Sequence, residues 1–285
     1  MQENNPKAYV AERHDPQRRP PGDPDCRLGA ERSSNQVRPD GTATTRAEWV
    51  WGYGSGVAAA THPVYGDVVL AEETRPFNVD DSAHYHPLHR QATARLGRPP
   101  TNVAADAAFD AWHIYQTCAA TGGLAAIPLN TRGHPAPRLG PNGRHLCPTG
   151  REMAPAYAYR HPDGFRAQEL RCPLLYPRPT AERCDHPQFA KGPGCKKYVN
   201  VEAGGRLRVA TDRQSAAYRA VYRQRTAAER SNSQAVALGI ERPRVRRASA
   251  VANLNTLTYI VINARALRRA RAINAHTAPD PPPLC

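Results

Sequence analysis

The alternation of short strands and helices between residues 48 and 129 restricts the fold of this chain more than any other feature. WVWGYGSGVAAAT and VVLAEET, joined by PVYGD, predict a β-hairpin that begins at Trp49. A helix from about Ser82 to Leu96 is expected next, then the strand NVAAD, a helix in AWHIYQTCAA capped by Asp110, and the strand LAAIPL. This order predicts an α/β fold with a parallel sheet flanked by helices.

Asp106 is the last residue of the predicted strand NVAAD. Ligands of such sheets collect at the carboxyl ends of the strands, so Asp106 is a candidate site residue.

Two nearby patterns favour structural roles instead. Gly52–Gly56 (GYGSG) lacks the Lys-Ser/Thr of a phosphate loop, and backbone crowding explains its glycines better. His84, His86 and His89 are expected to be surface histidines rather than a metal site.

The rest of the chain shows a different pattern on each side of this region. Residues 1–47 are polar and proline-rich and predict an extended or disordered segment, and 130–200 read as a turn-rich insertion. Within 201–273, GRLRVAT predicts a strand and two helices follow, the second from about Ala248 to Ile273; the tail 274–285 is expected to be disordered. The second helix is expected to be amphipathic, with an apolar face formed by Leu257, Ile260, Val261, Ala264 and Leu267.

The first of these two helices places a carboxylate among arginines. Asp212 is a candidate cap and Gly239 a stop, and between them Tyr222, Arg225 and Glu229 fall on one stripe at 3.6 residues per turn. Glu229 and Arg225 can form an exposed i,i+4 pair, which contributes only tenths of a kcal/mol. A partly covered Glu229 would need a stronger partner, such as a metal ion. Both interpretations stay open.

Charge favours a polyanionic partner. Lysine and arginine number 39 against 25 acidic residues, giving a formal net charge of +14. Nucleic acid is the leading candidate, and the run ERPRVRR, with Arg244, Arg246 and Arg247, is expected to add sequence-independent affinity for DNA unless it is only a solvated loop. A membrane is not expected, because the chain has no long apolar run and MQENNPKAYV lacks a secretory core; a cytoplasmic location follows.

Seven cysteines, an odd number, do not suggest a disulfide framework. Four of them, Cys147, Cys172, Cys184 and Cys195, lie in the insertion with His186 beside them. Four thiolates could form a tetrahedral Zn²⁺ site in a segment that is short of core, although the spacing lacks a CxxC pair. Free thiols in a reducing compartment are the alternative.

The order Asp, insertion, then Tyr-x2-Arg-x3-Glu on a helix resembles bacterial insertion-sequence transposases with a ribonuclease-H-like DDE domain. YRQRTAAERSNSQA, LGIERP and LNTLTYIVINARAL resemble one subgroup closely, as do WGYGSG, TRPFNVDD and VAADAAFDAW. The family signature continues with Lys seven residues after Glu, where this chain has Val236. The resemblance implies a ribonuclease-H-like mixed sheet flanked by helices, with 48–129 and 201–273 as the two parts of the DDE domain.

By this resemblance Asp106 and Glu229 are the second and third catalytic acids, which hold Mg²⁺ or Mn²⁺, and Tyr222 and Arg225 contact the DNA backbone. The first acid should end an apolar strand, and no such strand occurs before Ala47; the chain is expected to begin downstream of it, with impaired cleavage. Asp25 is the fallback candidate and Asp67 a weaker one, whereas Asp15 and Asp23 lie in proline-rich sequence.

The function implied is DNA transposition: metal-dependent phosphodiester cleavage and strand transfer at the terminal inverted repeats of a mobile element. The expected partner is double-stranded DNA, on which the chain would form a homodimer, in the bacterial cytoplasm and associated with the nucleoid. The alternative is a basic DNA-binding transposase remnant that does not cut.

Overall fold

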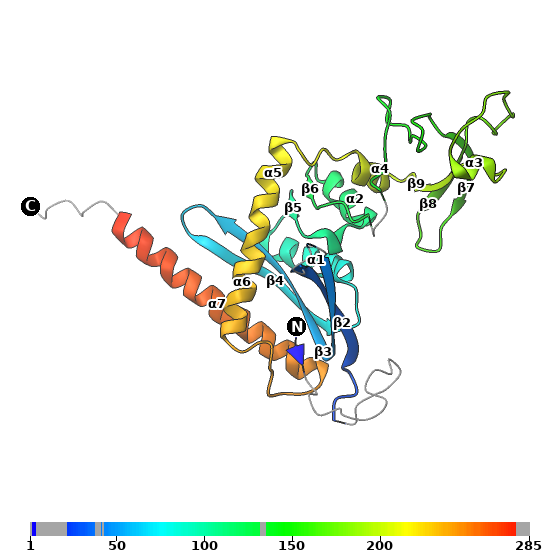
Figure 1. The fold of residues 1–285 in the computed structure, drawn as a ribbon. Coiled ribbons are helices and arrows are strands. Elements are labelled where there is room, and N and C mark those ends of the chain that lie inside the picture. Colours follow the sequence, from blue (N-terminus) through cyan, green and yellow to red (C-terminus); the bar gives the residue numbers. More distant parts are fainter. Residues whose placement is uncertain (1, 4–21, 38–40, 42, 132–134, 278–285) are drawn as a thin grey trace, which may run out of the picture. The chain divides into compact units, whose positions relative to one another are not determined.

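The computed structural model describes residues 2–3, 22–37, 41, 43–131 and 135–277. The chain forms two compact units, the first made of Met1–Pro100 and Arg223–Cys285 and the second of Thr101–Tyr222 (Figure 1). The described residues form a mixed α/β structure with a four-stranded, a two-stranded and a three-stranded sheet. The predicted α/β class is therefore confirmed.

The first unit is built on an antiparallel sheet. Strands β2 (Arg27–Val37), β3 (Ala43–His62) and β4 (Gly66–Pro76) pair in order of sequence, and β1 (Gln2–Glu3) also pairs with β3. The predicted hairpin is β3–β4. β2 and the start of β3 lie before Trp49, where the sequence predicted no strand. The prediction missed β2 because RLGAERSSNQV lacks the apolar alternation of a half-buried strand.

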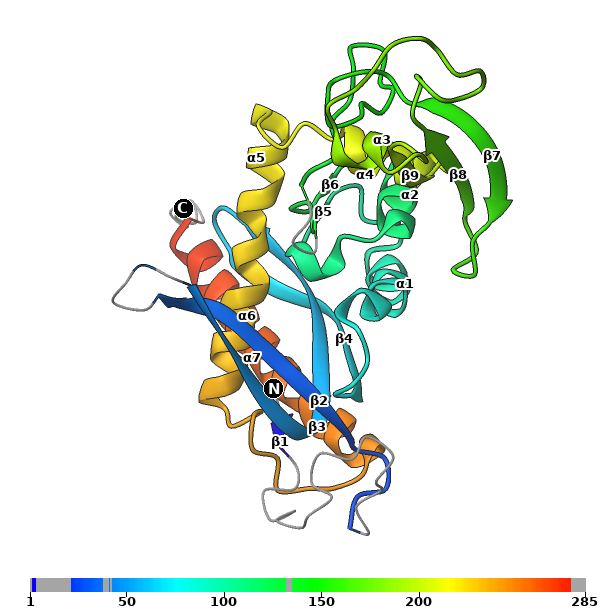
Figure 2. The ribbon, with the colours of Figure 1, turned by 45° about the vertical axis from the view of Figure 1, so that its right-hand side comes forward.

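Helices cover both faces of this sheet. The helices η1 (Asp81–His84) and α1 (Tyr85–Leu96) lie on one face, and α6 (Thr226–Ala237) and α7 (Ala248–Thr277) contact each other and β4 on the other (Figure 2). Adjacent residues of β4 show the two sides: Glu72 accepts a hydrogen bond from Thr256 of α7, whereas Glu73 contacts His84 of η1.

The face that α7 turns to the sheet differs from the predicted one. Leu257, Ile260, Val261 and Leu267 are 42–59% exposed, so the apolar face expected from the sequence is wrong. Polar residues face the sheet instead. Asn263 donates to the carbonyl of Val69 at 2.8 Å and accepts from its N–H at 2.9 Å, which satisfies backbone groups of β4 that lack a strand partner. Tyr259 and Ile262 complete this core with Val69, Ala235 and Ile240.

The second unit contains the expected parallel pair, β5 (Val103–Ala104) and β6 (Ala125–Ala126). Helix α2 (Trp112–Ala120) connects them after η2 (Ala107–Phe109), and α4 (Ala203–Ala210) and α5 (Ala216–Tyr222) belong to the same unit. The predicted strand GRLRVAT is wrong, because this segment forms α4. Gly204 is buried there, and a Cβ on it would lie 2.1 Å from the carbonyl oxygen of Trp112, so the backbones of α4 and α2 touch.

The predicted insertion contains an antiparallel sheet of its own, β7 (Ala154–Arg160), β8 (Arg166–Arg171) and β9 (Lys196–Asn200), with the short helix α3 (Pro187–Ala190). Leu170 and Val199 pack from this sheet against a buried cluster of cysteines. In the described part of the chain, even the longest helix lacks the apolar run that a membrane span requires.

Candidate functional site

Asp106 lies two residues after the end of β5, whereas the sequence predicted it as the last residue of the strand. Its side chain is exposed and accepts a hydrogen bond from the N–H of Ala108 at 2.9 Å, so it caps η2. Because β5 and β6 are parallel, this position is the carboxyl end of a parallel pair, where α/β proteins place ligand-binding groups. The exposed carboxylate can therefore meet a ligand from solvent.

Asp110 does not cap α2 as predicted, because the N-cap position is Ala111, which makes no side-chain cap bond. The side chain of Asp110 is 1% exposed and accepts hydrogen bonds from the Tyr115 hydroxyl at 2.9 Å and the Asn130 N–H at 2.6 Å. It also forms an ion pair with Arg208 at 2.6 Å. These contacts join α2, α4 and the segment after β6.

Glu229 lies in the first turn of α6 and pairs with Arg225 at 2.6 Å, with its side chain 54% exposed. This is the surface i,i+4 pair that the sequence left as one alternative. A short 3₁₀ segment, η3 (Arg223–Arg225), separates α5 from α6, so the predicted single helix is wrong. Tyr222 ends α5 and stacks on Tyr218 with 5.6 Å between ring centroids.

Asp106 and Tyr222 belong to the second unit, whereas Arg225 and Glu229 belong to the first. The predicted meeting of Asp106 and Glu229 around metal ions therefore stays a prediction.

The candidates for the first catalytic acid are held by structural contacts. Asp25 accepts a hydrogen bond from the N–H of Ala248 at 3.2 Å, at the start of α7. Asp67 binds both Nε and Nη2 of Arg230, at 2.6 and 2.8 Å, and this bond holds the pKa of its carboxyl below the usual value. Asp23 is buried and accepts from the Tyr53 hydroxyl at 2.5 Å. Asp15 lies outside the described residues.

The arginines proposed to bind DNA are exposed. Arg244, Arg246 and Arg247 lie in the segment between α6 and α7, and Arg247 has a positive φ of 73°. The Arg247 carbonyl accepts the first backbone bond of α7, from Val251, at 3.1 Å. These residues are exposed beside the start of a helix, although the guanidinium of Arg246 lies against Gly22. This arrangement is compatible with phosphate contact and with a solvated loop.

His84 is buried, so its expected surface position is wrong. It contacts Glu73 at 3.1 Å, and a Cβ on Gly56 would lie 2.9 Å from its ring. This close approach explains a glycine of GYGSG, as the sequence suggested. Burial lowers the pKa of His84, although the Glu73 charge opposes the shift.

The sequence did not identify a group of exposed tyrosines on the β7–β9 sheet. This tyrosine face consists of Tyr157, Tyr159 and Tyr198, of which Tyr157 is 51% and Tyr198 57% exposed. Ring centroids are 6.1 Å apart for Tyr157 and Tyr159 and 6.2 Å apart for Tyr159 and Tyr198. The alternation in APAYAYR was a signal for it, because every second residue of a strand shares a face.

Glu169 lies beneath these rings, 1% exposed, and pairs with Arg171. Hydrogen bonding to Glu169 raises the pKa of Tyr157 to about 12. Hydrogen bonds from Tyr157, Arg171 and Tyr198 in turn lower the pKa of Glu169. The carboxylate therefore orients the two most exposed tyrosines while their rings remain open to solvent.

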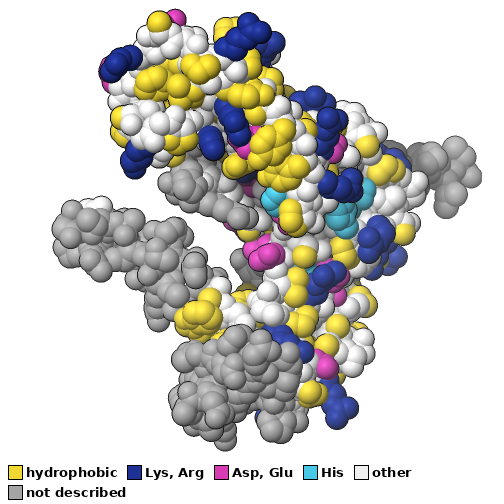
Figure 3. All heavy atoms as spheres, turned by 90° about the vertical axis from the view of Figure 1, so that its right-hand side faces the viewer, with side chains coloured by type: hydrophobic (Ala, Val, Ile, Leu, Met, Phe, Trp, Pro, Cys, Tyr) yellow, Lys and Arg dark blue, Asp and Glu magenta, His cyan; other side chains and the backbone are white. Residues whose placement is uncertain are grey.

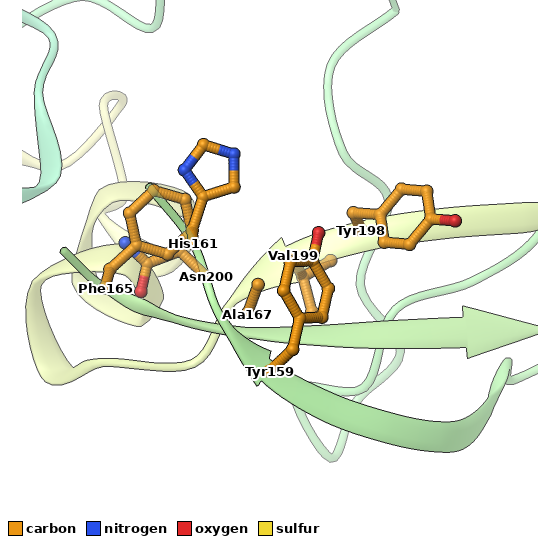
Figure 4. Close-up of a pocket in the computed structure, with 7 residues that line it drawn as sticks. All are labelled: Tyr159, His161, Phe165, Ala167, Tyr198, Val199 and Asn200. Atoms are coloured by element: carbon orange, nitrogen blue, oxygen red, sulfur yellow. The ribbon is translucent and has the colours of Figure 1, made fainter. Parts of the chain in front are cut away.

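A shallow pocket of about 270 Å³ opens beside Tyr159 and Tyr198, with His161 stacked on Phe165 at 4.4 Å along its edge (Figure 4). Its volume is just below the roughly 300 Å³ at which small-molecule pockets begin. Hydrophobic and basic side chains alternate over the part of the surface that carries this sheet (Figure 3). The exposed cations of its strands include Arg160, Arg166 and Lys196.

The four cysteines of the insertion lie together. Cys147, Cys172 and Cys195 are buried in one cluster and Cys184 packs against it. Within the described residues, no three or more His, Cys, Asp and Glu side chains are already placed as metal ligands.

A scan against protein-family models, a search of curated proteins and a search of solved structures each found no match. The functional assignment therefore depends on the residues of the chain itself and on the motifs described above.

Proposed function

We propose that the protein is a DNA transposase with a ribonuclease-H-like catalytic domain, in which Asp106 and Glu229 are metal-binding carboxylates. The observation that supports this most directly is the exposed carboxylate of Asp106 at the carboxyl end of a parallel strand pair. Mg²⁺ and Mn²⁺ prefer such oxygen ligands. When bound, two such ions stabilise the attacking and leaving oxygens of a phosphodiester.

The tyrosine face supports DNA as the substrate. Aromatic rings stack on unpaired bases at about 1–3 kcal/mol per base, and nearby cations attract the phosphate backbone. Tyr157 and Tyr198 offer open rings held in place by Glu169, and the exposed cation Lys196 lies two residues before Tyr198 on the same face of β9. A frayed or opened DNA end supplies both an unpaired base and a backbone.

A DNA-binding protein that does not cut is the second candidate. It is favoured by the ion pair of Glu229 with Arg225 and by the structural contacts that Asp25 and Asp67 make. In that case the basic and aromatic surfaces would bind DNA without a working metal centre.

One experiment separates these candidates. Nicking of supercoiled plasmid is measured with Mg²⁺ or Mn²⁺ for the natural chain, D106N, E229Q and the control E241Q, whose parent residue Glu241 is exposed on the same unit as Glu229. Binding of duplexes with a single-stranded end is measured by fluorescence anisotropy for the same proteins. Because the first catalytic acid is not identified in the chain, the proposal expects weak metal-dependent nicking that D106N and E229Q lose and E241Q keeps, with binding unchanged in all four.

Nicking that survives in both D106N and E229Q would remove these carboxylates from the mechanism. Binding without nicking by the natural chain would overturn cleavage in favour of the second candidate, and absence of binding would overturn both. The substitution Y198A should weaken binding about 5- to 150-fold, the loss of one stacked base. The control Y65A, in the β3–β4 hairpin, should leave it unchanged.

A further inference from the structure

The strand register brings two cysteines of the insertion together. Arg171 of β8 pairs with Lys196 of β9, so Cys172 and Cys195, the next residues outward, flank the same end of the ladder. The backbone is fitted to this approach. Gly194 has a φ of +66°, and a Cβ on it would lie 2.6 Å from the Cβ of Cys172.

A tight turn holds the third cysteine. In CPTGR the N–H of Cys147 donates to the carbonyl of Arg151 at 2.8 Å, and the N–H of Arg151 donates to the Cys147 Sγ at 3.3 Å. The Thr149 hydroxyl lies 3.1 Å from the same sulfur. These contacts fix the position of the Cys147 sulfur within the turn.

Thr149 also links the fourth cysteine to the group. Its hydroxyl lies 3.7 Å from the Sγ of Cys184, which is only partly buried. Next to Cys195, His186 approaches its Sγ to 3.5 Å through Nδ1. That nitrogen also accepts from the N–H of Gln188 as the cap of α3, so it is already used in the structure.

The insertion has little else to hold it together. Three of the six buried residues of its core cluster are cysteines, and the others are Met153, Leu170 and Leu174. Small segments with so little apolar core are commonly stabilised by disulfides or a metal. The six described cysteines of the chain are free thiols, so among the described residues no disulfide stabilises the insertion.

We propose that Cys147, Cys172, Cys184 and Cys195 bind one structural Zn²⁺ ion as a tetrahedral tetrathiolate site. The four thiols already share one cluster, and binding draws them to ligand distance. Each thiol that becomes a ligand releases its proton to solvent, so binding weakens as pH falls. The site is independent of the catalytic assignment, because it concerns how the insertion folds.

Metal content tests the proposal directly. The full chain is purified after expression with added zinc, and zinc is quantified by elemental analysis; Co²⁺ is then substituted and its visible spectrum recorded. We expect one zinc per chain and the absorption bands of tetrahedral thiolate-bound cobalt. C172S and C195S should each weaken zinc affinity by at least about 100-fold. The control C118S, which replaces a buried cysteine of α2 outside the cluster, should leave it unchanged.

A second measurement covers variants that fail to fold. In the natural chain a zinc chelator should reduce the hydrogen-exchange protection of β8 and β9, and added zinc should restore it. A natural chain that binds less than a stoichiometric amount of zinc at saturating metal would overturn the proposal. Equal zinc affinity in C172S and C118S would overturn it as well.

Discussion

Replacing Asp110 by Asn tests whether this carboxylate is structural while Asp106, four residues earlier, is free for function. The substitution conserves shape but removes the charge that Arg208 meets at 2.6 Å. Because Arg208 and the N–H of Asn130 both donate to Oδ2, the amide oxygen must take that position, and the new NH2 then faces the Tyr115 hydroxyl, which donates to Oδ1 in the natural chain. Breaking a fully buried ion pair costs about 3–5 kcal/mol. Because the Arg208 side chain is 26% exposed, solvent reduces this to about 2–3 kcal/mol.

The matched variant D106N should cost little. Asp106 is exposed and caps η2 through one hydrogen bond from Ala108, and Asn caps helices about as well as Asp. We expect a change within about 0.5 kcal/mol. Two acidic residues of one loop should thus differ in stability cost by about 2 kcal/mol, a difference that decides which of them is available for chemistry.

The assay must report on the second unit alone, since a chain of two units need not unfold in one step. Hydrogen exchange of peptides covering residues 101–131, measured over a urea series, gives the local free energy of unfolding. D110N should lose protection at markedly lower urea, and the Asn130 N–H, which donates to Asp110, should exchange fastest. In D110N/R208M the loss should be smaller than the sum of the single losses, because the unpaired guanidinium is gone.

Two results would refute this reasoning. If D110N resists urea as well as the natural chain, the contacts of Asp110 do not stabilise the unit. If D106N is as unstable as D110N, Asp106 is also structural, and its exposed position no longer supports a ligand-binding role.

Two further predictions concern the first unit. Because burial lowers the pKa of His84, the unfolded state binds more protons than the folded state between that pKa and about pH 6.5. The stability of the unit is therefore full above about pH 6.5 and decreases as pH falls toward the lowered pKa of His84. Urea titrations should show a smaller decrease in H84Q. G56A should destabilise this unit by about 1–3 kcal/mol, because the new methyl would lie 2.9 Å from the His84 ring. The control G54A, whose methyl would lie 3.7 Å from Phe77, should cost under about 0.5 kcal/mol. Equal melting temperatures of the two variants would contradict the clash with His84.

Features set by a few neighbouring residues could be predicted from the sequence. The β3–β4 hairpin, α1, α2, the parallel pairing of β5 with β6 and the position of Asp106 follow from apolar spacing and turn residues. Gly239, with its φ of 86°, follows α6 as expected of a helix stop. Strand β2 and helix α4 could not be predicted in this way, because their stability comes from pairing with β3 and from packing of Gly204 on α2.

The tertiary structure alone decided which side chains are buried and which meet. On α7 the apolar pattern favoured Leu257 and Ile260 as the core face, yet hydrogen bonds from Asn255 to Thr74 and from Asn263 to Val69 place the opposite face on the sheet. The same applies to the burial of His84. It applies equally to the gathering of four cysteines, which lie up to 48 positions apart in the sequence. The physical reason is that local patterns record the preferences of single segments, whereas burial and contact depend on which distant backbone groups still need partners.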